Sequence, residues 1–524
     1  MQQQLDHQLG HPRRWKILGV LVFSLLVVVL DNTILNVALK TIADPVEGLG
    51  ASQSEMEWAI NSYTLVFAGL LFTFGVIGDR TGRKRMLTIG MVVFGLASLA
   101  SAYAQDPTQL IVARAFMGIG GAAIMPATLA IISNVFPPQE RGKAIGIWAG
   151  GVGLAVAIGP ITGGLLIENY WWGSVFLVNL PIVLISMVLI TLVVPESCDP
   201  KPSRLDPVGV ILSIVGLVAI TYGIIRGGEL ATIASAEVLI PSILGVAVLA
   251  TFVWYERRID HPAFDVRYFT DVRFATAVGM VGIAFFAMMG GMFFLVFYLQ
   301  IVLGFSPLQA GALMIPFAAA QMIFAPLSQQ LAKRFGGKLT ATLSMVIVAG
   351  ALASYALMDQ NTSVVLIEIV FFVQGGAMAN IMTPATTTIM DSLPREKAGV
   401  GSAMSNTVRQ VAGALGVALL GSLLSATYRD EIASALTGLP ENLRHVAGES
   451  LTGTLGVAQG LGQRGAALIA PAKQAFLDGM HVTALVSAAI ALLGALMVLR
   501  WLPGKGVPAP SVQHTSNDKE PAVV

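Results

Sequence analysis

Residues 126–142, PATLAIISNVFPPQERG, decide the fold, because a close copy of this stretch occurs much later in the chain. The copy is PATTTIMDSLPREKAG at residues 384–399, about 258 residues further on. Both copies place Pro-Ala-Thr inside an apolar segment, then a polar turn with proline, and then a glycine that opens the next apolar segment. The sequence therefore predicts two related halves. Chance similarity between two short segments is the alternative.

The composition is that of a membrane protein. Of the 524 residues, 55% are hydrophobic and 12% are charged, whereas about 25% of the residues in soluble domains are charged. The net charge of +1 argues against binding to nucleic acid. A single cysteine, Cys198, excludes an internal disulfide and a cysteine-rich metal site. We therefore expect an all-α polytopic protein that lies in the lipid bilayer.

Fourteen apolar segments are long enough to cross a membrane, since a span needs about 20 largely apolar residues. An even number of spans places both termini on one side of the membrane. The polar ends, residues 1–15 and 503–524, lie outside it, and the Pro-rich tail is expected to be disordered. The predicted spans fall near residues 16–38, 57–78, 86–104, 109–134, 143–167, 174–194, 207–226, 237–255, 274–302, 308–332, 340–358, 363–390, 398–425 and 480–502.

The basic residues indicate which side the termini occupy. Most of the 31 Lys and Arg residues fall in the ends and loops that this count places beside the termini. Loops enriched in Lys and Arg are cytoplasmic. We therefore predict that both termini are cytoplasmic and that the chain is a multi-pass protein of the inner (plasma) membrane.

The repeat divides the spans into groups. The copied turn joins helices 4 and 5 in the first half and helices 12 and 13 in the second. The halves match only if the pair at 207–255 is an insert between six-helix bundles at 16–194 and 274–502, an arrangement of six, two and six. Residues 426–479 would form an extracellular loop, with an amphipathic hairpin on the membrane as one form it could take. Repeated halves are typical of secondary transporters, whose binding site lies between them.

The loop after the second span carries the first recognisable motif, GVIGDRTGRKRML at residues 75–87. Its spacing resembles the cytoplasmic loop signature of the major facilitator superfamily, which implies that fold and a latch between Asp79 and Arg83 on the closed cytoplasmic face. An ordinary positively charged loop is the alternative, but it does not explain the glycine and aspartate spacing. The predicted gating residues are Gly75, Asp79, Arg80, Gly82, Arg83 and Lys84.

Two further motifs narrow the resemblance. AVAIGPITGGLL, residues 155–166, lies in the fifth helix, where Gly159, Pro160, Gly163 and Gly164 remove side-chain bulk and one backbone hydrogen bond. It resembles the motif that marks antiporters in this superfamily. LDNTILNVAL, residues 30–39, is similar to the first helix of the fourteen-helix drug:proton antiporters of the EmrB/QacA type, with Lys40 where proline is usual. This resemblance covers nearly the whole chain.

Asp31 and Arg114 are charged residues inside predicted spans. A charge at mid-membrane costs about 2.5–3.5 kcal/mol on insertion scales, so each needs a partner or water. At 1.5 Å per residue, Asp31 lies about 22 Å from the cytoplasmic end of helix 1 and Arg114 about 8 Å from the outer end of helix 4. Their depths match, so they can face one another. The resemblance implies that Arg114 belongs to a helix 4 motif, although Met117 replaces its usual glutamine.

Asp31 is the predicted site where a proton and a cationic substrate compete. Alternatives are that Asp31 is permanently paired for structure and that Arg114 reaches the membrane surface. Glu368 and Arg409 are second candidates for proton or substrate coupling, although Glu368 could reach outer water and Arg409 could be structural. Met and aromatic side chains suit lipophilic cations. The candidate cavity lining is Asn32, Asn36, Met288, Met292, Phe293 and Phe297.

These features predict a proton-driven exporter of lipophilic, often cationic, small molecules that works by alternating access and acts as a monomer. A dedicated exporter of one endogenous antibiotic, lipid or siderophore on the same fold is the alternative. A membrane enzyme or receptor is disfavoured, because the six histidines lie outside the spans or at their ends. The chain also lacks a Gly-x4-Gly-Lys-Ser/Thr nucleotide loop. We expect no cofactor, no metal and no ATP hydrolysis.

Overall fold

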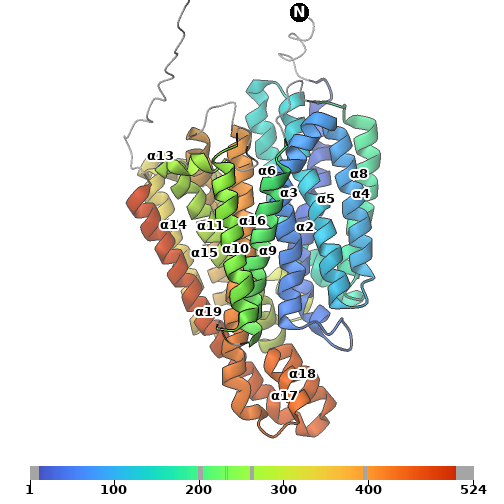
Figure 1. Cartoon of the computed structure of the whole chain (residues 1–524), viewed down its shortest axis with the longest axis vertical. Coiled ribbons are helices and arrows are strands. Elements are labelled where there is room, and N and C mark those ends of the chain that lie inside the picture. The colour runs from blue at the N-terminus through green and yellow to red at the C-terminus, as the bar shows by residue number, and fades with distance from the viewer. Residues whose placement is uncertain are drawn as a thin grey trace, which may run out of the picture.

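The computed structural model describes residues 11–198, 205–230, 232, 234–259, 262, 265–392 and 398–502. All regular structure in these ranges is helical, and the long helices run side by side along the longest axis of the molecule (Figure 1). The helices up to residue 256 are α2 (Arg14–Ala43), α3 (Gln53–Thr81), α4 (Arg83–Ala102), α5 (Pro107–Val135), α6 (Pro138–Asn169), α7 (Ser174–Leu177), α8 (Asn179–Val193), α9 (Pro207–Leu230) and α10 (Ala236–Glu256).

The remaining elements follow the same pattern of long helices with short helical turns between them. They are η1 (Val266–Thr270), α11 (Val272–Phe297), η2 (Tyr298–Val302), α12 (Pro307–Ala312), α13 (Ile315–Phe335), α14 (Gly337–Ser354), η3 (Tyr355–Leu357), α15 (Val364–Asp391), α16 (Ala398–Ile432), η5 (Ala433–Leu436), α17 (Glu441–Glu449), α18 (Leu451–Gly460), η6 (Gly462–Arg464) and α19 (Ala466–Trp501).

The structure confirms a polytopic membrane protein. Within the described ranges, 12 helices are long and apolar enough to cross a membrane, or 13 if the bent helix α3 counts as one span. Helix α6, at 32 residues, is not in that count. Fourteen spans were predicted from the sequence, so the helical, many-span architecture holds while the number fourteen stays a prediction.

The packing of the helices repeats in the two parts of the chain. Helix α2 packs against α5, α6 and α8, and α11 packs in the same way against α15, α16 and α19. Helix α3 pairs with α5 as α13 pairs with α15. Pro126 and Pro384, from the repeated sequence, lie inside the corresponding helices α5 and α15. We call α2–α8 the N-terminal set and α11–α19 the C-terminal set.

A glycine with positive φ connects two helices at the same place in each set. Gly82 ends α3 with φ +117°, and Gly336 ends α13 with φ +93°. Residues with a side chain rarely adopt such angles. The two turns therefore keep the same backbone geometry, although the acid of the first turn has no counterpart in the second.

We expect that Gly82→Ala and Gly336→Ala will each destabilise the purified protein by about 1–3 kcal/mol, because alanine must take a strained backbone conformation there. The measurement is the unfolding midpoint in detergent. Gly350→Ala is the matched control, since a Cβ at Gly350 meets nothing within 4 Å. Equal midpoints for all three variants would show that the turns carry no strain.

The pair α9–α10 connects the two sets. These helices pack on each other, and α9 also packs against α3 and α16 (Figure 1). Leu217 of α9 shares a small apolar cluster with Leu65 of α3 and Ala414 of α16. Ser422 of α16 donates a hydrogen bond of 3.1 Å to the carbonyl of Ile224. The pair α9–α10 therefore contacts both sets, through α9.

Residues 426–479 differ from the expected hairpin on the membrane surface. Helix α16 continues to Ile432, α19 already begins at Ala466, and α17 and α18 pack between these extensions. Figure 1 shows α17 and α18 projecting beyond the end of the bundle. Tyr428 and Thr454 share a buried hydrogen bond of 2.6 Å there. We call this the hairpin end and the opposite one, where α2 begins, the N-terminal end.

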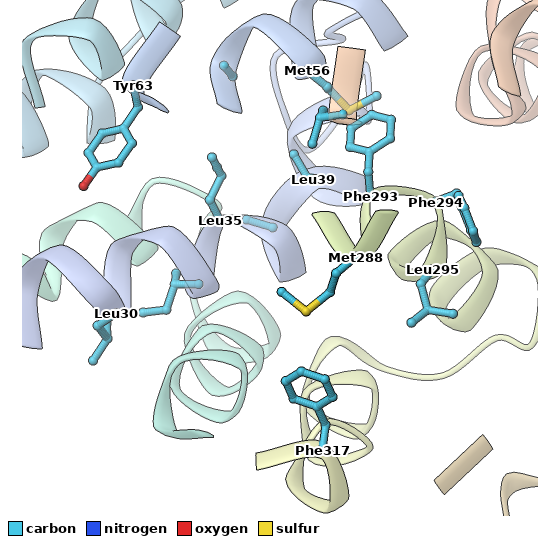
Figure 2. Close-up of a cluster of buried hydrophobic side chains, with 14 of the residues drawn as sticks. Leu30, Leu35, Leu39, Met56, Tyr63, Met288, Phe293, Phe294, Leu295 and Phe317 are labelled. Atoms are coloured by element: carbon cyan, nitrogen blue, oxygen red, sulfur yellow. The ribbon is translucent and has the colours of Figure 1, made fainter. Parts of the chain in front are cut away.

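The two sets meet toward the hairpin end. Lys40 donates to the carbonyl of Gln300 at 3.4 Å, and the Gln300 side chain donates to the carbonyl of Val37 at 3.0 Å. Gln300 lies in the short π-helix η2, an irregularity often found at functional positions. Around these bonds, Leu35 and Leu39 of α2 lie near Met288 and Phe293 of α11 (Figure 2). A mainly apolar seam thus closes the hairpin end.

Candidate functional site

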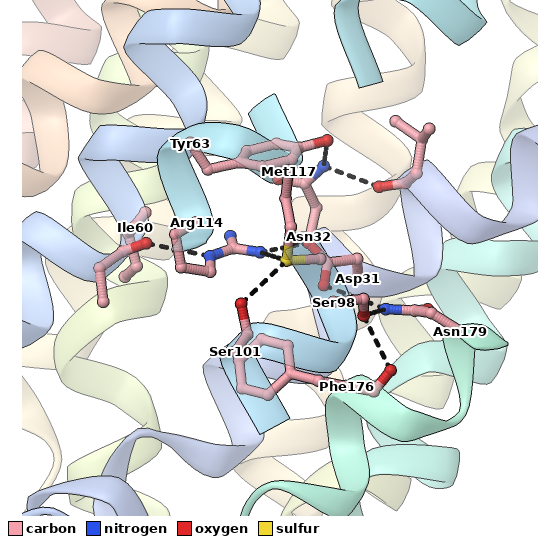
Figure 3. A network of polar contacts seen from close by, with 12 residues as sticks. Asp31, Asn32, Ile60, Tyr63, Ser98, Ser101, Arg114, Met117, Phe176 and Asn179 are labelled. Atoms are coloured by element: carbon pink, nitrogen blue, oxygen red, sulfur yellow. Dashed lines mark hydrogen bonds and ion pairs between the residues drawn. The ribbon is translucent and has the colours of Figure 1, made fainter. Parts of the chain in front are cut away.

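Asp31 and Arg114 form an ion pair in the interior of the N-terminal set (Figure 3). The two residues are 2% and 1% exposed. This confirms the expectation, drawn from their matching depths, that the side chains face one another. Arg114 therefore points inward to a carboxylate, and the alternative in which it reaches the membrane surface is wrong.

Further contacts hold the Arg114 guanidinium in place. It donates a hydrogen bond of 3.1 Å to the carbonyl of Ala59, and it lies 4.5 Å from the centroid of the Tyr63 ring. The Tyr63 hydroxyl in turn accepts a hydrogen bond of 3.2 Å from Asn32. The ring face stabilises the cation, and the carbonyl satisfies a second donor. Arginine stays charged in proteins, so Asp31 is the member of the pair that can change its charge.

Asn179 links Asp31 to the other side of the N-terminal set. Its amide donates to Asp31 at 3.4 Å and to the Ser98 hydroxyl at 3.0 Å. Ser98 then donates to the carbonyl of Phe176 at 2.8 Å. These residues were missed in the sequence analysis. The available signal was an isolated polar residue, Asn179, inside the apolar run FLVNLPIV.

The ion pair between Asp31 and Arg114 is enclosed, but α2, which carries Asp31, also lies at the seam. Asp31 bonds with Arg114 of α5 and Asn179 of α8, both in its own set. Asn32 and Asn36 are only half-buried, and the same helix carries Val37 and Lys40, which bond to Gln300 of the other set. Helix α2 therefore carries both the Asp31 side of the ion pair and contacts to the other set.

The other two charged candidates lie in the C-terminal set. Glu368 is half-buried on α15, and Arg409 lies on α16 with its guanidinium 5.2 Å from the centroid of the Phe285 ring. Among the described residues, no hydrogen bond or ion pair joins either of them to the Asp31 pair. The structure therefore brings Asp31 and Arg114 together, while Glu368 and Arg409 lie apart from them on two different helices of the C-terminal set.

The six residues predicted to line a cavity differ in how deeply they are buried. Asn32, Asn36 and Met292 are half-buried, as residues beside a cavity would be. Met288, Phe293 and Phe297 are 5%, 1% and 3% exposed and pack in the apolar core. The rings of Phe293 and Phe297 are 5.8 Å apart. In this conformation the last three belong to the packed seam.

The glycines of the antiporter motif bring α6 close to two other helices. A side chain at Gly159 would overlap Thr33 of α2, and one at Gly164 would overlap the backbone of Leu308 in α12. Pro160 lies within α6, where its carbonyl closely approaches Gly311 of α12. The motif therefore sits where α6 contacts both its own set and the opposite one.

The predicted gating loop is bonded within the N-terminal set. Arg83 forms an ion pair of 2.7 Å with Asp79 and donates to the carbonyl of Ala130 at 3.4 Å. The Lys84 backbone donates to Glu196 at 3.0 Å. Gly75 and Gly82 lie on either side of Asp79 and Arg80 on the last turns of α3. The Asp79–Arg83 contact is thus present, while its role in gating stays a prediction.

One buried acid was not among the predicted site residues. Glu57 is 1% exposed on α3, and one of its carboxylate oxygens has no hydrogen-bond partner among the described residues. The second predicted span starts at residue 57, and the sequence analysis did not consider Glu57. The helix in fact begins one turn earlier, at Gln53, which places Glu57 inside the bundle.

Comparisons with known proteins agree with this architecture. The Major Facilitator Superfamily profile matches residues 21–417. The multidrug efflux pump LfrA of Mycolicibacterium smegmatis is 35% identical over 93% of this chain and 96% of its own length. The methyl viologen resistance protein SmvA of Salmonella typhimurium is 32% identical over 93% of this chain and 98% of its own length.

A solved structure with the same fold is that of a bacterial homologue of the human lysosomal transporter Spinster, in an inward-facing and unoccupied conformation. It aligns with a TM-score of 0.66 at 18% identity and covers 95% of this chain and 99% of that one. This likeness shows the fold alone. The family profile and the relatives identify the chain as a transporter rather than an enzyme. The chain belongs to the Major Facilitator Superfamily and, within it, to the family of multidrug efflux pumps that its motifs resemble.

Proposed function

We propose that this protein is a proton-coupled antiporter that exports lipophilic, often cationic, compounds by alternating access. The observation that carries the proposal is the enclosed ion pair between Asp31 and Arg114. Ionisable side chains are costly inside a membrane and mark proton or ion pathways. The efflux and resistance functions in the names of the relatives support the choice of cargo.

The proposed topology has fourteen spans. They are the 12 candidates, the bent helix α3 and the 32-residue helix α6. The six-helix bundles at 16–194 and 274–502 flank the inserted pair at 207–255, and both termini are cytoplasmic in the plasma membrane. The hairpin end, with residues 426–479, then faces outward, and the contacts at the seam close the outer side. The protein works as a monomer.

In the proposed mechanism, protonation of Asp31 removes the charge that holds Arg114. Breaking a buried ion pair from one side costs about 3–5 kcal/mol, enough to change how α2 and α5 pack. Because α2 also carries the seam contacts of Val37 and Lys40, the change loosens or tightens the outer closure. Asp79 and Arg83 serve as the latch at the cytoplasmic end.

Substrate binds between the two sets in the state open to the cytoplasm. The half-buried residues that supply contacts to the substrate are Asn32 and Asn36 of α2 and Met292 of α11. The two asparagines offer polar contacts, and the methionine offers an adaptable apolar one. Arg409 and Glu368 are secondary charges of the C-terminal set that bias which substrates bind there. Met288, Phe293 and Phe297 become accessible only when the seam opens.

Uptake into inside-out vesicles tests this function. Methyl viologen, an organic dication, should accumulate when the vesicle interior is acidified, and the accumulation should collapse when an ionophore removes the gradient. Accumulation that is equal with and without the gradient would rule out proton coupling. A panel of unrelated lipophilic cations separates a multidrug pump from a dedicated exporter, because a dedicated exporter would transport one chemical type only.

A further inference from the structure

Glu57 lies where three helices from different parts of the fold meet. It belongs to α3 of the N-terminal set, and a side chain placed at Gly421 of α16 would lie 2.7 Å from its carboxylate carbon. Helix α9 of the inserted pair packs against both α3 and α16. The carboxyl group is therefore packed directly against the other set, on the seam that closes the hairpin end.

The stability of α3 does not explain this acid. Glu55 already provides the carboxylate of the capping box at the start of the helix, where it bonds with Ser52. Glu57 lies a further half-turn into the helix, where the benefit of a negative charge fades. A buried, unpaired carboxylate costs free energy, so its position calls for another cause.

Polar groups without partners surround Glu57 along one face of α3. Gln53, Glu57 and Asn61 follow each other at intervals of four residues and so share a helix face. The side chains of Gln53 and Asn61, like that of Glu57, contain buried atoms without a hydrogen-bond partner among the described residues. Leu65, the next residue on this face, packs near Ala414 of α16. Because Glu57 and Leu65 on this face lie against α16, separation of α3 from α16 would bring water to it.

The charged groups that face this region do not neutralise Glu57. Glu229 forms an ion pair with Arg226 of its own helix, and the two side chains are 33% and 34% exposed. Arg429 of α16 donates to the carbonyl of Gly228 at 3.2 Å. On α17, Glu449 forms a contact of 3.1 Å with His445. Among the described residues, no cation forms an ion pair with Glu57.

We propose that Glu57 is a second proton-binding site, which must carry a proton before the seam at the hairpin end can close. With the seam open, water reaches the carboxylate and supports its charge. With the seam closed, the group lies against the backbone of α16 without a counter-ion, so the neutral acid fits and the anion does not. The proton comes from the outer solution, which suits a carrier that imports protons while it exports drugs.

This inference rests on the proposed function, because it adds a second proton site to the same transport cycle. It has its own consequence for conformation. Each closing event takes up one proton at Glu57, so the ratio of open to closed molecules should rise about tenfold per pH unit through the titration range. This dependence can be measured without any transport.

Spin labels at Val46 and Leu357 report the opening of the seam. These residues are 81% and 83% exposed, lie at the hairpin end and belong to different sets. The full chain, with its exposed Cys198 replaced by serine, is labelled as Val46→Cys with Leu357→Cys and placed in lipid nanodiscs. We expect short distances at low pH and a growing population of long distances as the pH rises.

The side chain in Glu57→Gln resembles the protonated acid. Closing of the seam in this variant should take up one proton fewer than in the wild type, and the short distances should be favoured at all pH values. Glu57→Asp should keep the dependence if the variant folds. Glu449→Gln is the control for a rival group, because burial raises the pKa of the Glu449 carboxyl. An unchanged pH profile in Glu57→Gln, or a loss of the profile in Glu449→Gln alone, would overturn the proposal.

The same series in an Asp31→Asn, Arg114→Gln background separates the two proposals. Asp31 cannot titrate there, so the remaining pH dependence should belong to Glu57 and disappear in Glu57→Gln. A background without any pH dependence would overturn the role of Glu57 alone. The role of Asp31 is judged independently, by gradient-driven uptake in vesicles.

Discussion

Asp31→Asn should strongly reduce acid-driven uptake of methyl viologen. Asparagine cannot bind and release a proton, so substrate movement loses the proton that Asp31 carries. The variant also leaves the buried Arg114 cation, 1% exposed, without its counter-ion. A stability loss of about 3–5 kcal/mol is expected from such a broken pair, measurable as a lower unfolding midpoint in detergent.

A double variant separates coupling from stability. Asp31→Asn with Arg114→Gln removes both charges, and replacing both members of a buried pair is often close to neutral for stability. We expect the double variant to regain most of the unfolding midpoint while acid-driven uptake stays strongly reduced. If it regained uptake as well, the Asp31 pair would be a structural element only, which is the alternative left open by the sequence.

Gly164→Leu is expected to have the second largest effect. Leucine there would overlap the backbone of Leu308 in α12 and force α6 away from the C-terminal set. Overpacking costs about 1–3 kcal/mol, and about 1.4 kcal/mol shifts an equilibrium tenfold. The closed hairpin end should lose population, and transport should fall by about tenfold. The spin-label distance between Val46 and Leu357 would lengthen at low pH.

Gly350→Leu is the matched control, because a Cβ at Gly350 of α14 meets nothing within 4 Å. Both variants add the same side chain to a helix, but only one of them lies where the two sets touch. We expect Gly350→Leu to insert and to transport like the wild type. Equal transport in the two variants would mean that the contact between α6 and α12 is not needed for the cycle.

Features that depend on one helix at a time could be predicted from the sequence. Apolar length indicates a span, and depth along a span follows from its rise per residue. This is why the pairing of Asp31 with Arg114 and the place of Pro126 and Pro384 in corresponding helices were within reach. The repeat was readable because both copies keep the same turn between two helices.

Features that depend on helix rotation and on contacts between helices were out of reach. Asn179 bonds to Asp31 only because α8 turns that face toward α2. The run of Met and Phe residues in α11 is apolar on all faces, so no pattern separated Phe293 in the core from half-buried Met292. Glu57 was not considered, and the predicted span starts at this residue, whereas the helix begins one turn earlier.

The hairpin of α17 and α18 shows a different limit. Its residues combine apolar clusters with charges, and the sequence analysis predicted a hairpin on the membrane surface. The extensions of α16 and α19 beyond the bundle carry it outward instead. Sequence alone does not reveal how far a membrane helix continues outside the bilayer, because the last turns of α16 and the first turns of α19 look like loop.

Substrate-driven proton movement tests the central claim most directly. Proteoliposomes with a trapped pH indicator and no initial pH gradient receive methyl viologen on one side only. The account predicts that wild-type protein will move protons against the flow of methyl viologen and that the Asp31→Asn, Arg114→Gln variant, although it is folded, will move fewer protons, limited to those that Glu57 carries. Proton movement at the wild-type rate in that variant would contradict the claim that Asp31 couples the two flows.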